Sequence, residues 1–205
     1  MKRPIMDAGP GLNFFSLHRE RLLFGALGSL SIPEAVAAEI RRRSGQDRRF
    51  AAADGVMRKI PGRLLEVLSD DLTADLARAV ERIGRTPAAE RLRTSKDLGE
   101  TLVIAHAAVA AEAGADVIVL IDDGGGRRAA AAEARRLERL RAQGAGVGSI
   151  RLIGTLTVLE RAAGSEHLPD RGDMRDLYNR LRDLDDGLPP LKDTQLMSLP
   201  CWRPS

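Results

Sequence analysis

The chain has 205 residues, a mass of 22.2 kDa and a formal net charge of +3. Its length suits one hydrophobic core and is short for two ordinary domains, and a hydrophobic content of 43% predicts a folded protein. A single cysteine, Cys201, excludes a disulfide framework and a cysteine zinc site, and 3% aromatic residues argue against a base-stacking platform. No apolar run approaches membrane length and no signal-peptide core is recognisable, so we expect a cytoplasmic protein without membrane contact.

The predicted elements alternate between strands and helices. A short strand at residues 5–6 ends at Asp7, and a helix follows over residues 12–24, where apolar residues recur at helical spacing. A second helix over residues 31–43 opens with the capping-box pattern Ser-x-x-Glu, which gives Glu34 a structural role.

The middle of the chain is polar and helical in pattern. Residues 44–93 are interrupted at Pro61-Gly62 and between Gly84 and Pro87, and we interpret them as helical hairpins laid on the core. They would form an extended insert within the first domain.

The second half returns to alternating order. A helix over 98–113 precedes the continuous apolar run 117–121, which is typical of a strand buried in a parallel sheet. A helix over 127–143, a strand over 150–153 and a helix over 155–163 complete the order. The predicted class is α/β, with a central, mostly parallel sheet flanked by helices.

Several acidic residues lie at the ends of these elements. Asp7 and the pair Asp122–Asp123 directly follow apolar strands, where aspartate also commonly begins a turn. Glu39 lies late in its helix, where the helix dipole disfavours an anion, while Asp97 and Glu100 fit the N-cap and third residue of the next helix. Because the carboxyl ends of parallel strands meet at one edge, such carboxylates can gather in a crevice and hold a hard cation.

Six short motifs follow one another in the chain. They are Ile5-Met-Asp-Ala-Gly-Pro, Ile32-Pro-Glu-Ala-Val-x-x-Glu-Ile40, Gly99-Glu100, Leu120-Ile-Asp-Asp, Arg127-Arg-Ala and Ile153-Gly-Thr-Leu-x-Val-Leu159. In this order they resemble the PIN-domain nucleases, specifically the toxin-like branch of uncharacterised PIN proteins. The similarity covers residues 4–43 and 94–164, and a set of ordered motifs is more specific than any one of them.

The resemblance implies a three-layer PIN-like fold and a metal-dependent endoribonuclease. In this family, four acidic positions from separate element ends bind Mg²⁺ or Mn²⁺ and cleave RNA. By position, the resemblance implies catalytic roles for Asp7, Glu39, Glu100, Asp122 and Asp123, all but Glu39 also as metal ligands. It further implies an RNA substrate, homodimerisation and a cognate antitoxin, so that the chain would be the toxin of a type II toxin–antitoxin pair.

The chemistry suits these residue types. Clustered carboxylates repel each other and raise one another's pKa unless a divalent cation neutralises them. Such a cation lowers the pKa of a bound water and neutralises the scissile phosphate, so neither a histidine nor a serine nucleophile is required. We interpret His18 and His106 as ordinary helix residues.

Arginine outnumbers lysine 28 to 4, and short arginine runs can pair with phosphate. Examples are Arg41–Arg43, Arg48–Arg49 and Arg135–Arg136, each of which fits a solvated helix face equally well. Arg127 and Arg128 are the candidates for contact with a substrate phosphate, because they follow the acidic pair.

The chain also departs from the family pattern. Gly124–Gly126 replaces the basic residue that commonly follows the acidic pair, and we interpret it as a slack loop rather than a phosphate cradle. The PIN-like domain would span residues 1–164, with 44–93 as its insert. Residues 165–205 would form a C-terminal extension with a charged helix over 170–186.

Two alternatives remain. In the first, Gly124–Gly126 binds the phosphate of a nucleotide, although the run lacks the G-x-G-x-x-G spacing and a Walker lysine. In the second, a PIN-like fold has lost its activity and serves as a binding protein; occupancy of all the acidic positions counts against this.

Overall fold

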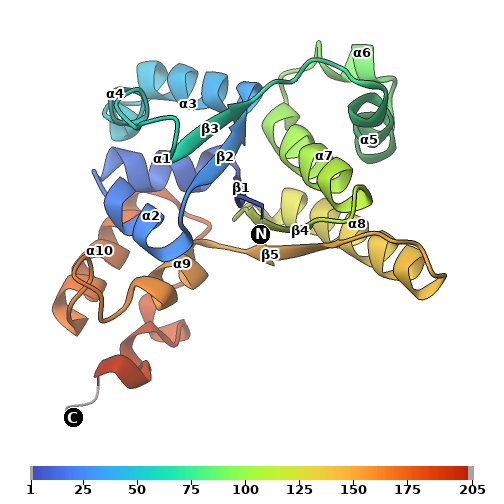
Figure 1. Ribbon diagram of the computed structural model, residues 1–205. Helices are drawn as coiled ribbons and strands as arrows, with labels where there is room; N and C mark the ends of the chain where they lie inside the picture. The colour runs from blue at the N-terminus through green and yellow to red at the C-terminus, as the bar shows by residue number, and fades with distance from the viewer. Residues whose placement is uncertain (1, 203–205) are drawn as a thin grey trace.

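The computed structural model describes residues 2–202, and within them five parallel strands form one sheet (Figure 1). The strand order is β3-β2-β1-β4-β5, and every neighbouring pair is parallel. The strands are β1 (Ile5–Met6), β2 (Leu30–Pro33), β3 (Leu65–Leu68), β4 (Asp116–Leu120) and β5 (Ser149–Ile153). The predicted α/β class with a parallel central sheet is confirmed.

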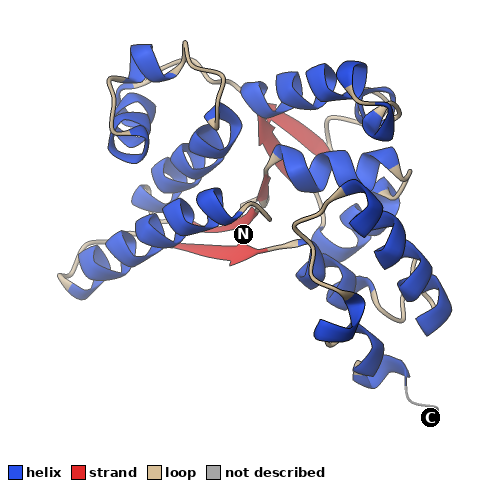
Figure 2. Ribbon diagram, turned by 180° about the vertical axis from the view of Figure 1, so that it is seen from behind, coloured by secondary structure: helices blue, strands red, loops and turns tan. Residues whose placement is uncertain are grey.

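The helices lie in two groups on either side of this sheet, as the views from front and back show (Figures 1 and 2). One group consists of α1 (Ala8–Ser16), α2 (Glu20–Leu27), α3 (Glu34–Gln46), α4 (Ala53–Met57), α9 (Thr155–Ala162) and α10 (Arg171–Leu184). The other consists of α5 (Ala74–Gly84), α6 (Ala88–Arg91), α7 (Leu98–Glu112) and α8 (Gly124–Ala142). Helix–sheet–helix layering of this kind buries both faces of the sheet.

The direction of the chain reverses at the centre of the sheet. From β1 the chain moves outward to β2 and β3, then crosses back to β4 and continues to β5. The carboxyl ends of β1 and β4 therefore lie side by side, and the N–H of Asp7 donates to the carbonyl oxygen of Leu120 at 3.0 Å. In open parallel sheets such a reversal leaves a crevice at the carboxyl edge, where ligands bind.

Two helices replace the single helix predicted over residues 12–24. Helix α1 begins directly after Asp7 and ends at Ser16, and α2 begins at Glu20. Between them His18 has a φ of 54°, in the left-handed region that terminates helices. The apolar spacing continued across this break and concealed it.

The prediction that residues 44–93 form only helical hairpins was wrong. The helical parts α4, α5 and α6 are present, but residues 65–68 form β3, which pairs with β2 at the edge of the sheet. Val67 is 52% exposed and Glu66 is also exposed, so the strand lacks the apolar run that marks a central strand. Its pairing with β2 makes it a strand.

The predicted capping box at residues 31 and 34 was also wrong. Ser31 lies within β2, and its hydroxyl donates to Glu66 of the neighbouring strand at 3.0 Å. Pro33 occupies the N-cap position and Glu34 is the first residue of α3, where its Oε2 accepts the N–H of Asp70 at 3.1 Å. The helix begins three residues later than predicted because residues 30–33 pair with β3.

The C-terminal helix is confirmed as α10. Its buried Tyr178 donates its hydroxyl to the carbonyl oxygen of Pro189 at 2.7 Å, and the segment beyond ends in three 3₁₀ turns, η2 (Leu191–Asp193), η3 (Leu196–Ser198) and η4 (Pro200–Trp202). A hydrogen bond of 2.9 Å from Asn13 of α1 to Asp185 attaches the end of α10 to the first helix of the core. No helix within residues 2–202 is both long and apolar enough to cross a membrane.

Candidate metal centre

Asp7 lies where β1 ends, at the crevice between the carboxyl ends of β1 and β4. Its side chain is 6% exposed, and although it occupies the N-cap position of α1 it accepts no capping hydrogen bond. Burial raises its pKa to about 6, and the charges of Glu39 and Asp123 act in the same direction. The amides of Ala8 and Gly9, at the start of α1, partly oppose this shift. Asp7 is thus a buried carboxyl close to two other acids.

Glu100 approaches the same region from the first turn of α7. Burial, followed by the charges of Asp123, Asp7, Asp97 and Glu39 in that order, raises the pKa of its carboxyl to about 7. No cation contributes to this shift. Carboxyls with mutually raised pKa values are a common feature of functional sites, because a charged ligand can relieve their repulsion.

Two glycines allow the acid-bearing elements to approach closely. At Gly99, in α7, a Cβ atom would lie 3.1 Å from Oε2 of Glu39 and 3.8 Å from Oδ1 of Asp7. At Gly126, in α8, a Cβ atom would first meet Cδ1 of Ile121 and would lie 2.9 Å from Oε2 of Glu100. Any larger residue at either position would have to displace a carboxylate, so both glycines are needed to bring α3, α7 and α8 together around the acids.

The neighbours Asp122 and Asp123 differ in their bonding. Both carboxylate oxygens of Asp122 are used by Thr155, whose N–H donates at 2.8 Å and whose hydroxyl donates at 2.6 Å. Asp123 caps α8 through Oδ1 alone, which accepts the N–H groups of Gly125 and Gly126 at 2.6 and 3.1 Å. Its second oxygen accepts no hydrogen bond from residues 2–202. Asp122 therefore anchors β4 to α9, and Asp123 retains an oxygen for a ligand.

A cavity of about 490 Å³ opens at this edge of the sheet. Asp7, Asp122 and Asp123 line it together with Asp185 of the C-terminal extension and Arg43 of α3. Larger cavities occur elsewhere, including one of about 560 Å³ beside α2, but none of the predicted acids lines that one.

Glu39 is placed differently from the other predicted acids. It lines a separate cavity of about 220 Å³ with Leu98 and Gly99, and its Oε1 lies 3.9 Å from the guanidinium of Arg43. The carboxylate of Glu100 lines neither cavity and lies against the first turn of α8. The structure thus brings Asp7, Asp122 and Asp123 to one cavity, with Glu39 and Glu100 at its margin.

The glycine run after the acids forms the first turn of α8, so the slack loop predicted there was wrong. Asp97, by contrast, occupies the N-cap position of α7 as anticipated, with a φ of 53°, but its side chain makes no capping bond. That leaves Asp97 among the charges that surround Glu100.

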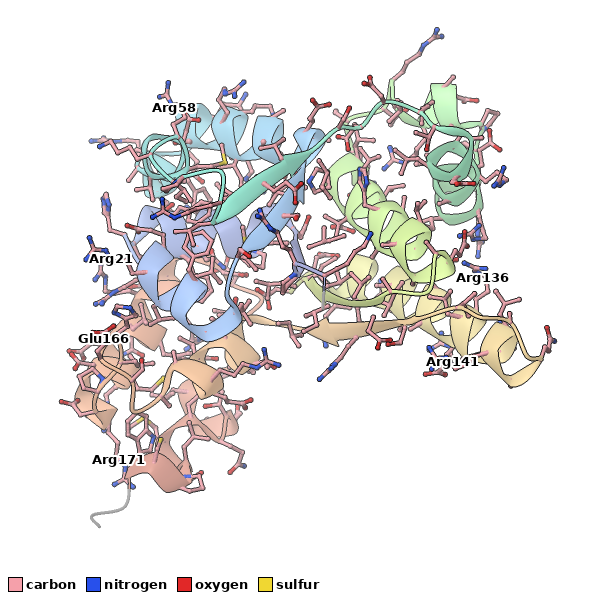
Figure 3. All side chains as sticks on the ribbon, viewed as in Figure 1. Arg21, Arg58, Arg136, Arg141, Glu166 and Arg171 are labelled. Atoms are coloured by element: carbon pink, nitrogen blue, oxygen red, sulfur yellow. The ribbon has the colours of Figure 1, made fainter. Side chains whose placement is uncertain are left out.

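The two arginines predicted to contact phosphate also differ. Nη1 of Arg127 donates to the carbonyl oxygens of Ile121 and Ile153 at 2.9 and 3.4 Å, so its guanidinium joins the ends of β4 and β5. Arg128 is exposed, lies beside Gly124 and makes no ion pair with residues 2–202. Many other arginines point outward from the rim of the molecule, as Arg58 does in Figure 3.

The sequence reasoning did not identify two residues of the cavity wall. Asp185 lies in the turn after α10, where its Oδ1 accepts the N–H of Gly187 at 2.9 Å and its Oδ2 accepts from Asn13, which is 2% exposed. Arg43 was recognised only as one of three consecutive arginines. The Asp-Asp-Gly sequence at 185–187 signalled a turn but not its position beside the acids.

The donor set fits a divalent metal ion in its chemistry. Carboxylates are the preferred ligands of Mg²⁺ and Mn²⁺, and burial and neighbouring acids raise the pKa values of Asp7 and Glu100, which a bound cation would lower. In their present positions, no three His, Cys, Asp or Glu side chains of residues 2–202 form a group that could hold a metal ion.

No protein-family model matches the chain, and no curated protein or solved structure is significantly similar to it. The function is therefore inferred from the residues of the site.

Proposed function

We propose that the protein is a metal-dependent endoribonuclease that hydrolyses RNA phosphodiester bonds with Mg²⁺ or Mn²⁺. One observation carries the proposal: Asp7 and Asp123 line one cavity at the reversal point of the sheet, with Glu39 and Glu100 nearby, and burial together with the neighbouring acids raises the pKa of Asp7 and Glu100. Such an arrangement is unfavourable for folding alone and is stabilised by a cation. The resemblance to PIN-domain nucleases supports the same activity.

Asp7, Glu100 and Asp123 would hold the metal. Asp7 and Glu100 supply carboxyls that form no ion pair with residues 2–202, and Asp123 supplies its second oxygen. A bound divalent cation supplies Lewis acidity, which lowers the pKa of a water molecule and neutralises charge on the phosphate. Glu39, close to Asp7 on the other side of Gly99, is placed to orient water or accept a proton.

Asp122 has a positioning role in this proposal. Its two hydrogen bonds to Thr155 fix the end of β4 and thereby the direction of the following Asp123. Arg127 assists by binding the carbonyl oxygens of Ile121, directly after β4, and of Ile153, the last residue of β5. These contacts keep the acidic edge rigid.

The cellular role that we propose is that of a toxin in a toxin–antitoxin pair, acting as a homodimer. The support is the resemblance of the motifs, together with a cavity whose wall is rich in carboxylates. An antitoxin that inserts a lysine or arginine there would replace the charge of the metal and block the site.

The nucleotide-binding alternative is less well supported. The N–H groups of Gly125 and Gly126, which would have to cradle a phosphate, are bonded to Asp123. A phosphate at that position would also lie against an uncompensated carboxylate. The melting temperature measured with ATP or NAD, and then with Mn²⁺, distinguishes the two alternatives, because only a ligand that binds the native state raises it.

The test is the substitution Asp7→Asn, which keeps the size of the side chain and removes an anionic ligand. Cleavage of a pooled RNA substrate and the Mn²⁺-induced rise in melting temperature should both be lost, with the metal-free melting temperature equal or higher. Asp71→Asn is the matched control, because Asp71 is exposed and its side chain has no partner among residues 2–202. Undiminished Mn²⁺-dependent cleavage by the Asp7→Asn variant would remove Asp7 from the mechanism.

A further inference from the structure

The three consecutive arginines of α3 point in different directions. Successive helical residues are rotated by about 100°, so neighbours on a helix cannot share a face. Arg41 approaches Asp54 at 3.8 Å and Arg42 donates to Gln46 at 2.8 Å. Arg43 alone lines the acidic cavity that contains Asp7.

An aromatic ring holds the guanidinium of Arg43 in place. Its Cζ lies 5.3 Å from the ring centroid of Phe50, which is 3% exposed and lines the same cavity. The guanidinium of Arg49 lies 5.4 Å from the same centroid, but Asp47 binds it at 2.8 Å. A cation–π contact of this kind restrains a guanidinium without using its N–H groups.

The donors of Arg43 are therefore unused. Its guanidinium makes no hydrogen bond with residues 2–202, and its one ion-pair partner, Glu39, is 3.9 Å away. Arg127 is the opposite case, because its guanidinium is committed to strand carbonyl groups. A partly exposed pair at 3.9 Å such as Glu39–Arg43 contributes little to stability, so pairing alone does not explain a guanidinium held beside the acids.

We propose that Arg43 binds a phosphate oxygen of the RNA strand beside the scissile bond. This inference rests on the proposed nuclease function and identifies a substrate-binding residue outside the acidic set. A cavity lined by Asp7, Asp122 and Asp123 repels a phosphodiester, and a rigid guanidinium in its wall offers paired N–H donors that fit phosphate. A cation bound to the carboxylates would weaken the attraction between Glu39 and Arg43 and leave Arg43 free to contact the substrate.

The experiment measures how RNA binding depends on salt. Binding of a labelled single-stranded RNA is measured in the Asp7→Asn background, which removes one repelling carboxylate and prevents cleavage, with Arg43→Ala compared with Arg41→Ala. Loss of one phosphate contact should reduce the slope of log affinity against log salt by about 0.7. Arg43→Ala should show this reduction and roughly tenfold weaker binding at low salt. Arg41→Ala, which removes the same charge from the same helix, should keep the slope.

A conservative variant distinguishes charge from geometry. Arg43→Lys should retain most of the salt slope and bind with intermediate affinity, because lysine keeps the charge and loses the paired donors. It also serves as the test variant if Arg43→Ala fails to fold. A structural role for Arg43 would lower the melting temperature without changing the slope.

Cleavage by the wild-type chain is measured in parallel. Equal salt slopes for Arg43→Ala and Arg41→Ala would overturn the inference, and with cleavage intact would leave the nuclease proposal standing. A slope reduced only in Arg43→Ala, with no cleavage by the wild type, would overturn the nuclease and support the phosphate contact. Failure of the chain to bind RNA at all would overturn both.

Discussion

Helix α7 carries a glutamate near each end, and the two lie in opposite electrostatic surroundings. Burial and the surrounding acids raise the pKa of Glu100, in the first turn, to about 7. Glu112, the last residue, pairs with Arg82 of α5 at 2.9 Å and with Arg136 of α8. Arg136, labelled in Figure 3, belongs to the helical group on the far side of the sheet from α1.

The far end of α7 shows how this chain compensates acids when they serve the fold. Glu133 is 7% exposed, and both Arg82 and Arg136 bind it, at 3.1 and 2.9 Å. Two arginines and two glutamates thus form a balanced network that joins α5, α7 and α8. A chain with 28 arginines that leaves Glu100 without such a partner has a site where negative charge is retained. The unpaired acid at the start of α7 therefore suits a functional site, whereas the ion-pair network at its end stabilises the fold.

The largest effect that we expect comes from replacing the glutamate at either end of α7 with glutamine. Glu100→Gln should reduce RNA cleavage at least about 100-fold, because loss of a direct metal ligand should exceed the 10- to 100-fold effects of second-shell residues. Glu112→Gln should leave cleavage within about twofold and lower the melting temperature. Initial rates on the same RNA pool and thermal melts measure both. If the two variants lose cleavage equally, the two ends of α7 do not differ in function.

The second expectation concerns pH and the metal-free protein. The pKa of Asp7 rises from 3.8 to about 6 in the folded state, so its contribution to stability is fully present below pH 3.8 and is lost as pH rises through about 6. Asp7→Asn should remove roughly 2 to 3 kcal/mol of this decline in the free energy of unfolding. Urea titrations between pH 4 and pH 7 measure it. If the free energy of unfolding declined equally in the wild type and in Asp7→Asn, Asp7 would not cause the decline.

The third expectation examines the compensated end. Glu133→Gln should destabilise the fold by about 2 kcal/mol, because Arg82 and Arg136 lose a buried anion, and cleavage should be retained. Chemical denaturation with a parallel cleavage assay measures both quantities. Loss of cleavage in a folded Glu133→Gln protein would mean that the network contributes to the site.

The smallest expected effect separates the two neighbouring aspartates. Asp122→Asn replaces one of the two acceptors of Thr155 and should cost about 1 kcal/mol of stability. Asp123→Asn keeps Oδ1 as a capping acceptor, so it should change stability less and cleavage more. Cleavage rates and urea denaturation give the ratio of activity loss to stability loss, which should be larger for Asp123→Asn than for Asp122→Asn. A larger activity loss in Asp122→Asn would reverse their assigned roles.

The sequence predicted those features that depend on local pattern. The apolar run before Asp122 and the short strand before Asp7 identified β4 and β1, and both acids were expected at strand ends. Parallel order then placed those ends on one edge. Strand β3 was missed because its exposed residues resemble a loop until β2 pairs with it.

Other features depend on neighbours that a pattern does not name. Three identical arginines in a row gave no indication that only Arg43 would lie over Phe50. The adjacent Asp122 and Asp123 were equivalent in sequence, and Thr155, some thirty residues further along the chain, decides which one keeps a free oxygen. The partners of Glu112 likewise come from α5 and α8.

Direct calorimetric titration with Mn²⁺ near pH 7 tests the central claim that uncompensated acids at the sheet edge hold a divalent cation. The wild-type chain should bind Mn²⁺ and release protons, seen as a heat that changes with the ionisation enthalpy of the buffer, because Glu100, with a pKa of about 7, must deprotonate to bind. Glu100→Gln should lose both the affinity and the proton release, and Glu112→Gln should keep them. Equal Mn²⁺ binding by all three proteins, or no binding by the wild type, would contradict the account.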